Sequence, residues 1–107
     1  MSSISKGTVG AINEIRIAVN LMTLSWSVFR SLSQNGPTDL IAVKGRTVLK
    51  VQCKSSLNGQ FQNLRSGSND LLAIVTAGEI RYRARTKRVA KMFPSCGIVR
   101  KPKKSSR

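Results

Sequence analysis

One long helix-like segment, followed mainly by strand-like segments, is the feature that most constrains the fold of this chain. Between Thr8 and Leu24 there is no proline and no glycine after Gly10, and apolar residues recur at helical spacing. From Trp26 onward the pattern changes to alternation or to short apolar runs, both typical of β-strands. We therefore expect an α/β fold, with a mixed β-sheet of about five strands and a leading helix packed on it.

The expected elements follow one another with short connections. Strands are expected at 26–31, 39–43, 47–54, 71–76 and 80–85, and a turn at 44–46 makes a hairpin of the second and third. A short helix is expected at 86–93, with Thr86 as its cap. The length of 107 residues fits one domain, assigned to 1–93, while the Gly-, Pro- and Lys-rich residues 94–107 are expected to form a basic, flexible tail.

A strong excess of positive charge points to a polyanionic partner. The chain has 19 Lys and Arg residues against 4 Asp and Glu residues, which gives a formal net charge of +15. Such an imbalance attracts phosphates over long distances, although it is also consistent with a role in solubility alone. The charge is concentrated at the C-terminal end, because 11 of the basic residues and no acidic residue lie in 81–107.

A nucleic-acid backbone is a polyanion that these charges suit. The alternating Arg81, Arg83 and Arg85 suit contacts to a phosphate backbone, or else protect an edge strand from aggregation. The full set of candidate DNA-binding residues is Lys6, Lys44, Arg46, Arg65, Arg81, Arg83, Arg85, Lys87 and Arg88.

The cysteine and histidine content excludes several kinds of site. Cys53 and Cys96 lie far apart without metal-binding spacing, and the chain contains no histidine, so zinc sites and histidine-based catalysis are excluded. Cys53, between Gln52 and Lys54, is typical of a buried thiol on a strand, and a reducing compartment is expected. Polar residues such as Glu14 interrupt the N-terminal segment, so neither a signal peptide nor a membrane span is predicted.

Glu14 lies near the middle of the apolar arc of the leading helix. The arc comprises Glu14, Ile15, Ile17, Ala18, Val19, Leu21 and Met22, with Asn13, Arg16, Asn20 and Thr23 on the opposite side. An ionised carboxylate that faces a core is costly unless it is paired or binds a metal, which makes Glu14 a candidate metal ligand. A salt bridge to a core-facing Lys or Arg, or a helix shifted by one residue, would explain the same pattern.

Asp39, Gln52 and Lys54 form a second candidate cluster. Asp39 stands at the head of one expected strand, and Gln52 and Lys54 project from the same face of the next. Phosphodiester hydrolysis requires a hard cation held by oxygen ligands, an activated water and positive charge near the phosphate. The Asp39 carboxylate, the Gln52 amide and the Cys53 backbone carbonyl supply oxygens, and Lys54 suits orientation or deprotonation of the water.

Each of these residues also has an ordinary structural explanation. Asp39 could equally cap a turn. Gln52 is also consistent with an exposed strand residue, and Lys54 with a solvated lysine at a sheet edge. The catalytic interpretation depends on all three occurring together on adjoining strands. Trp26 and Phe29 are expected in the core rather than in base stacking, because they lie within an apolar pattern.

These residues carry a resemblance to a known family. Pro37-Thr38-Asp39 and Gln52-Cys53-Lys54, preceded by the helix with Glu14, resemble the PD-(D/E)xK nuclease superfamily in its QxK variant. The resemblance covers roughly residues 6–84, and it is strongest to the small group I intron homing endonucleases and archaeal Holliday-junction resolvases. The chain departs from the usual motif at Thr38, which replaces a second acid, and at Gln52, which replaces Glu or Asp.

The resemblance implies a restriction-endonuclease-like core and a Mg²⁺-dependent DNA endonuclease, with Mn²⁺ able to substitute. It implies that Asp39, Gln52, Glu14 and the Cys53 carbonyl hold the metal and that Lys54 assists the attacking water. A homo-oligomer, dimer or tetramer, is expected, because cleavage of two strands needs two sites.

The resemblance further implies a cytoplasmic location in a bacterial, archaeal or phage-infected cell, with no membrane partner and no small-molecule cofactor. A non-catalytic nucleic-acid-binding protein that retains the nuclease-like fold is the alternative. A small basic RNA-binding protein, such as a ribosomal component, is a third possibility, in which the candidate site would have no purpose.

Overall fold

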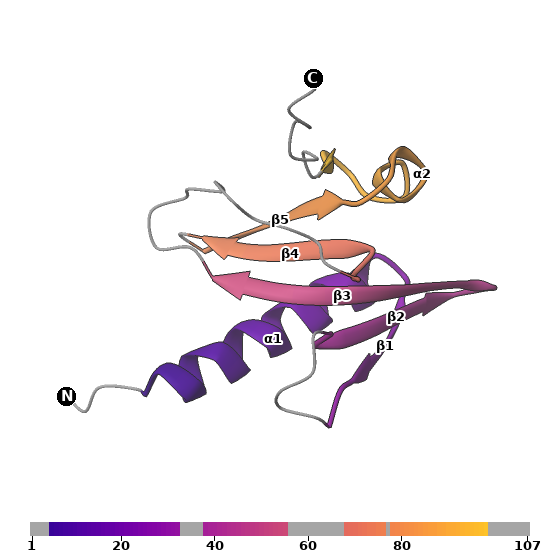
Figure 1. The fold of residues 1–107 in the computed structure, drawn as a ribbon. Helices are drawn as coiled ribbons and strands as arrows, with labels where there is room; N and C mark the ends of the chain where they lie inside the picture. The colour runs from indigo at the N-terminus through magenta and orange to yellow at the C-terminus, as the bar shows by residue number, and fades with distance from the viewer. Residues whose placement is uncertain (1–4, 33–37, 56–67, 77, 99–107) are drawn as a thin grey trace, which may run out of the picture.

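The described part of the chain forms a six-stranded mixed sheet with one long helix against one face (Figure 1). The computed structural model describes residues 5–32, 38–55, 68–76 and 78–98. The elements in chain order are α1 (Lys6–Thr23), β1 (Ser27–Arg30), β2 (Leu40–Lys44), β3 (Thr47–Ser55), β4 (Leu71–Thr76), β5 (Glu79–Ala84), α2 (Lys87–Ala90) and β6 (Gly97–Ile98). The expected mixed α/β fold with a leading helix is confirmed.

Strands that are neighbours in the sequence are also neighbours in the sheet. β1, β2 and β3 form an antiparallel meander, β3 and β4 are parallel, β4 and β5 are antiparallel, and β5 and β6 are parallel. In the turn between β2 and β3, Gly45 has a φ of 60°, which costs glycine little because it has no Cβ. The expected hairpin is therefore confirmed.

β6 is a strand that the sequence does not predict. Gly97 and Ile98 pair with Arg83 and Ala84 at the end of β5. These residues lie within the segment that composition assigns to the basic tail, and two residues are too few to show a strand period. Residues 99–107 of that segment lie outside the described part of the chain.

Local hydrogen bonds determine where α1 begins and ends. At its start the Ser5 hydroxyl caps the helix by accepting a backbone N–H of the first turn at 3.2 Å. At its end Ser25 has a φ of 73°, and the N–H groups of Ser25 and Trp26 donate to the carbonyls of Met22 and Leu21. This is the Schellman arrangement, which reverses the chain and directs Trp26 into the core.

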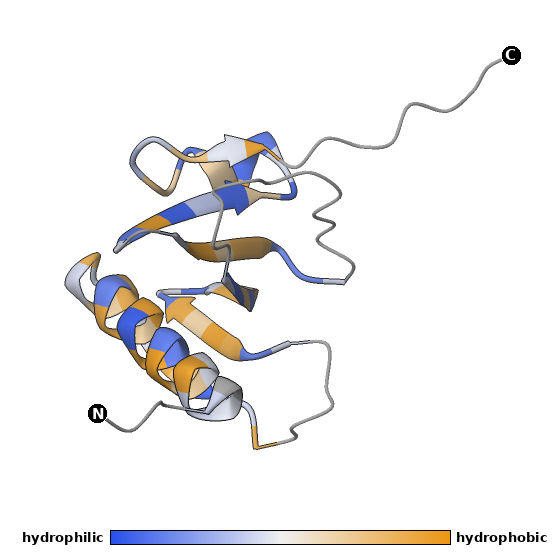
Figure 2. Cartoon of the chain, turned by 90° about the vertical axis from the view of Figure 1, so that its left-hand side faces the viewer, coloured by the Kyte–Doolittle hydropathy of each residue, from blue (hydrophilic) through white to orange (hydrophobic). Residues whose placement is uncertain are grey.

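α1 packs on the sheet through a different face from the one that the sequence pattern predicts. Ile17 and Leu21 are fully buried in the core, as expected. Ile15, Val19 and Met22 are 50 to 55% exposed, so their expected core positions are wrong. Figure 2 shows hydrophobic and hydrophilic residues interspersed along the whole helix.

Two asparagines account for this rotation of α1. The Asn20 Oδ1 accepts a hydrogen bond from the Tyr82 hydroxyl at 2.5 Å, and the Asn13 Nδ2 donates to the Ser55 Oγ at 2.7 Å. The sequence pattern places both asparagines on the solvent side, but partners on the sheet satisfy their amides. The sheet-facing side of α1 is therefore partly polar.

Aromatic rings close the core beyond the end of α1. Trp26 stacks on Phe93 with a centroid distance of 5.4 Å, and Tyr82 lies 5.0 Å from Phe93. The Lys44 ammonium lies 4.7 Å from the Trp26 ring centroid, within cation–π range. The expected core position of Trp26 is confirmed, whereas that of Phe29 is wrong, because its side chain on β1 is 59% exposed.

Ile17→Ala should lower the free energy of unfolding by about 2–5 kcal/mol, because it leaves a cavity at a fully buried position. Ile15→Ala on the same helix is the matched control, and it should change that free energy by less than about 0.5 kcal/mol. Urea unfolding followed by circular dichroism measures both variants. Equal losses would contradict the helix face described above.

Candidate metal site and nucleic-acid face

Asp39 is held immediately before β2 by three separate segments. Its N–H donates to the Val51 carbonyl on β3, and its carbonyl accepts the Ser31 N–H, both at 3.0 Å. The preceding Thr38 hydroxyl donates to the Asn69 Oδ1 at 2.8 Å, and Asn69 is buried. The backbone that carries the Asp39 carboxylate is therefore fixed on both sides.

The Asp39 carboxylate lies beside the backbone of Cys53. Its Oδ2 accepts a hydrogen bond from the Cys53 N–H at 2.8 Å. The N–H and C=O of one strand residue point toward the same neighbouring strand, so the Cys53 carbonyl also points to the side of Asp39. A carboxylate and a backbone carbonyl therefore face the same space where β2 begins.

Glu14 approaches this end of the sheet from α1. Its Oε1 lies 3.4 Å from the Nε of Arg30, the last residue of β1. Glu14, Arg30 and Asp39 all line one depression of about 460 Å³, whose helix side consists of small residues from the first turns of α1. The structure thus brings two of the predicted metal ligands to one depression and adds an arginine to them.

Gln52 and Lys54 lie on the other face of the sheet. Val51 and Cys53 pack toward the core under α1, and the alternation along β3 directs Gln52 and Lys54 the opposite way. Neither side chain is among the described residues that line the depression. The Asp39 N–H bonds the carbonyl of Val51, the residue that precedes Gln52 on β3. The motif residues therefore surround the start of β2 from both faces.

Basic residues share the face of Gln52 and Lys54. The register across β3, β4 and β5 forms two rows, Lys54–Ile74–Arg81 and Gln52–Leu72–Arg83. The two middle residues are fully buried, although they are not part of the core under α1. Because neighbouring strands are about 4.8 Å apart, the outer Cα atoms of each row are about 10 Å apart. We call this surface the basic face, defined by Lys54, Arg81 and Arg83.

The other predicted DNA contacts are more widely distributed. Three of them lie beyond the end of β5 and are exposed: Arg85, Lys87 and Arg88. Arg46 is exposed in the turn between β2 and β3, whereas Lys44 donates to a backbone carbonyl at the end of α1 at 2.8 Å. The side chain of Lys6 and the whole of Arg65 lie outside the described part of the chain.

Arg30 is a site residue that the sequence does not identify. Alternation along the strand predicts that Arg30 shares a face with Trp26 and Val28. This is the one sequence feature that indicates an inward-facing arginine. Its partner Glu14 comes from a different element, and only the packing of α1 beside β1 brings the two charges within 3.4 Å. The salt bridge that the sequence leaves open for Glu14 is therefore present, with Arg30 as the partner.

The ionisation of Cys53 is shaped by its place beside the two carboxylates. Burial raises the pKa of the Cys53 thiol, and the negative charges of Asp39 and Glu14 raise it further. Burial also raises the pKa of Tyr82 and of Cys96. Since the thiolate is the form that attacks, the Cys53 side chain is unsuited to act as a nucleophile at neutral pH. Its backbone carbonyl is the group that faces Asp39.

The oxygen donors at the start of β2 fit a hard divalent cation. Two carboxylates and a backbone carbonyl are of the ligand type that Mg²⁺ prefers, and Mg²⁺ commonly uses one or two carboxylates and keeps several waters. In the described part of the chain, no three His, Cys, Asp or Glu side chains gather where they could hold a metal. The oxygen donors that would hold Mg²⁺ there are the carboxylates of Asp39 and Glu14 and the Cys53 carbonyl.

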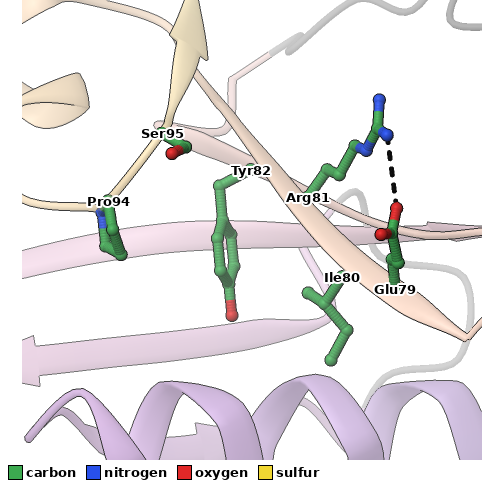
Figure 3. Close-up of a pocket in the computed structure, with 6 residues that line it drawn as sticks. All are labelled: Glu79, Ile80, Arg81, Tyr82, Pro94 and Ser95. Carbon is green, nitrogen blue, oxygen red and sulfur yellow. Dashed lines mark hydrogen bonds and ion pairs between the residues drawn. The ribbon is translucent and has the colours of Figure 1, made fainter.

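A second depression lies along β5, away from these donors. It has a volume of about 590 Å³ and is lined by Glu79, Ile80, Arg81, Tyr82, Pro94 and Ser95 (Figure 3). Arg81 pairs with Glu79 at 3.2 Å, and both side chains are more than half exposed. Glu79 is the one carboxylate among its described lining residues, so this depression offers a poorer set of metal ligands than the first.

The class defined by these features is a mixed α/β fold with a leading helix, similar to that of a homing endonuclease. The solved structure of the bacterial homing endonuclease I-Ssp6803I superposes with a TM-score of 0.63 and 17% sequence identity, covering 74% of this chain and 68% of that one. No protein-family model matches the chain, and no curated protein sequence matches it. Neither helix of the described ranges is long and apolar enough to cross a bilayer.

Asp39→Asn should accelerate alkylation of Cys53 by iodoacetamide at pH 8.5 by at least about twofold. Removal of the Asp39 charge lowers the pKa of the thiol and so increases the thiolate fraction at a fixed pH. Mass spectrometry of the Cys53 peptide measures the rate separately from that of Cys96.

Asp70→Asn is the matched control for this measurement. The Asp70 Oδ2 accepts the Lys50 N–H at 2.9 Å, and its charge does not contribute to the raised pKa of Cys53. The Asp70 variant should keep the wild-type alkylation rate. Equal rates in the two variants would contradict the placement of the Asp39 charge beside Cys53.

Proposed function

We propose that this chain is a Mg²⁺-dependent DNA endonuclease of the PD-(D/E)xK superfamily, in its QxK variant. The observation that carries the proposal is that the Asp39 and Glu14 carboxylates line one depression, and that the Asp39 Oδ2 accepts the Cys53 N–H there. The fold similarity to a homing endonuclease supports a nuclease function.

In this proposal Asp39, the Cys53 carbonyl, Gln52 and Glu14 hold the metal, and Mn²⁺ is able to replace Mg²⁺. The metal would lower the pKa of a bound water and neutralise charge on the phosphate. Asp39 is suited to the central role, because hydrogen bonds to Ser31 and to Val51 on β3 hold its backbone and one bond orients its carboxylate. Gln52 supplies an uncharged amide oxygen, so the two carboxylates provide most of the attraction.

Lys54 is proposed to act on the attacking water and on the developing phosphate charge. It projects from the same face of β3 as Gln52, two residues further along the strand. Its ammonium is a compact charge on a flexible stem, suited to reach a phosphate that lies over the start of β2. Asp39 and Lys54 would therefore approach the scissile phosphate from different sides.

The basic face is proposed to hold the DNA backbone beside the cleavage site. Arg81 and Arg83 lie in the same two rows as Lys54 and Gln52, about 10 Å away. Contacts to phosphates from such a face position the duplex without reading its sequence. Arg85, just beyond β5, would extend this contact.

One domain of this size carries one proposed site and cuts one strand per encounter. Cleavage of both strands, or of a junction, would require two sites, and a symmetric homo-oligomer, dimer or tetramer, is proposed to supply them.

Asp39→Ala and Lys54→Ala should each reduce Mg²⁺-dependent cleavage of plasmid DNA by about 10²-fold or more, because each removes a group that acts at the phosphate. DNA affinity in Ca²⁺ should change far less. The measurements are nicking of supercoiled plasmid, with linear and branched DNAs as further substrates, and binding by fluorescence anisotropy.

The matched control for these variants is Lys91→Ala. It removes an exposed charge outside the proposed site, and this variant should cleave at the wild-type rate. Chelation of the metal should abolish cleavage by the wild type. Undiminished cleavage by either site variant would refute the assignment.

A non-catalytic DNA-binding protein is the second candidate. The ion pair between Glu14 and Arg30 favours it, since a carboxylate that is already paired does not require a metal. This candidate predicts salt-dependent DNA binding without a metal requirement and without cleavage of any DNA form. The plasmid assay with Mg²⁺ and Mn²⁺ separates the two candidates.

Arg83→Gln should weaken DNA binding similarly for unrelated sequences and should lower the slope of log K against log[salt] by about 1. The reason is the loss of one phosphate contact on the basic face. Arg16→Gln on α1 removes the same charge on the other side of the sheet, where Arg16 bonds the Gly78 carbonyl, and it should leave the slope unchanged. Anisotropy titrations at several salt concentrations measure both slopes, and equal slopes in the two variants would contradict a contact at Arg83.

A further inference from the structure

Arg30 lies beside Glu14 in the depression that Asp39 also lines. Its Nε lies 3.4 Å from the Glu14 Oε1, and it lines the same depression as Asp39. It is the one cationic side chain among the described lining residues of that depression. The positive charge of a guanidinium there reduces the electrostatic repulsion between the two carboxylates. A bound metal ion would reduce the same repulsion.

The backbone of β1 fixes where Arg30 stands. Arg30 pairs with Leu40, the first residue of β2, and the next residue, Ser31, donates its N–H to the Asp39 carbonyl at 3.0 Å. The Cα of Arg30 therefore stays beside Asp39 whatever its side chain does. Only the side-chain torsions decide which anion the guanidinium contacts.

The ion pair is exposed enough to exchange partners. The Arg30 side chain is 57% exposed and the Glu14 side chain 26% exposed. Exposed pairs of this kind are weak, because water screens them and the long side chain loses freedom when it is held. Arg30 is therefore able to leave Glu14 when a stronger cation arrives.

We propose that Arg30 is a positioning residue that pairs with Glu14 in the metal-free protein and transfers to a DNA phosphate when a divalent ion binds Glu14 and Asp39. The proposal rests on the proposed nuclease function. A guanidinium matches the geometry of phosphate oxygens with two parallel hydrogen bonds, so the released arginine has a suitable new partner. Metal binding and phosphate binding are thereby coupled through one side chain.

Metal affinity without DNA tests the first half of the proposal. Arg30→Gln should bind Mn²⁺ about three- to tenfold more tightly than the wild type, because the competing cation is removed. Electron paramagnetic resonance of free Mn²⁺ measures the affinity. Arg30→Lys restores the charge and should return the affinity to within about twofold of the wild type.

Two controls separate this effect from a general change of charge or fold. Arg16→Gln removes the same charge from α1 outside the depression and should leave Mn²⁺ affinity unchanged. In a Glu14→Gln background, Arg30→Gln should have little further effect, since the pair is already broken. An unchanged affinity in Arg30→Gln, or an equal gain in Arg16→Gln, would overturn the proposal.

DNA binding with and without Ca²⁺ tests the second half. Arg30→Gln should weaken DNA binding more in Ca²⁺ than in chelator, because the wild-type arginine is available to a phosphate only after the metal has taken Glu14. The factor by which Arg30→Gln weakens DNA binding should be about threefold larger in Ca²⁺ than in chelator. An equal loss in both conditions would show that Arg30 contacts DNA independently of the metal, and would also overturn the proposal.

Failure of the proposal and failure of the nuclease function give different results. If wild-type protein binds no Mn²⁺ and cuts no DNA, the proposed function is wrong and this proposal fails with it. If wild-type protein binds Mn²⁺ and cuts DNA but Arg30→Gln binds Mn²⁺ no more tightly, only the role of Arg30 is wrong.

Discussion

The two-sided pairing of β3 is the constraint on which the rest of the structure depends. β3 is the longest strand, antiparallel to β2 on one side and parallel to β4 on the other. Leu49 and Val51 on one face bury the core under α1. The end of the same strand offers the Cys53 backbone to Asp39 and directs Lys54 to the basic face. Core, candidate metal site and candidate DNA contact are therefore set by one register.

The depression and the basic face lie on different sides of the sheet. Glu14 and Asp39 line the depression beside α1, whereas Lys54, Arg81 and Arg83 occupy the other face. Lys54 and Arg83 therefore project away from the depression, whereas Arg30 pairs with Glu14 inside it. This arrangement lets a polyanion approach a surface of favourable sign while the oxygen donors remain available at the start of β2.

Local patterns predicted several elements because local physics decides them. The almost continuous apolar run 71–76 is a strand with those bounds, and all six of its residues are buried. Thr86 caps α2 by accepting the Val89 N–H at 3.3 Å, as its position before the helix indicates. The rotation of α1 was not predictable in this way, because it depends on whether Asn20 finds a partner, and that partner, Tyr82, lies on a distant strand. The same holds for β6, which is too short to carry a period.

By itself, the sequence determined the leading helix and the positions of the main strands along the chain. It also identified the candidate site residues Asp39, Gln52, Lys54 and Glu14. These depend on periodicity and on residue types along one segment, which are local properties. Only the tertiary structure decided that Glu14 shares a depression with Asp39 and that Arg30 is its partner. It also decided which face holds Gln52 and Lys54. The reason is physical: a contact between distant segments depends on how α1 and the strands pack, and no single segment carries that information.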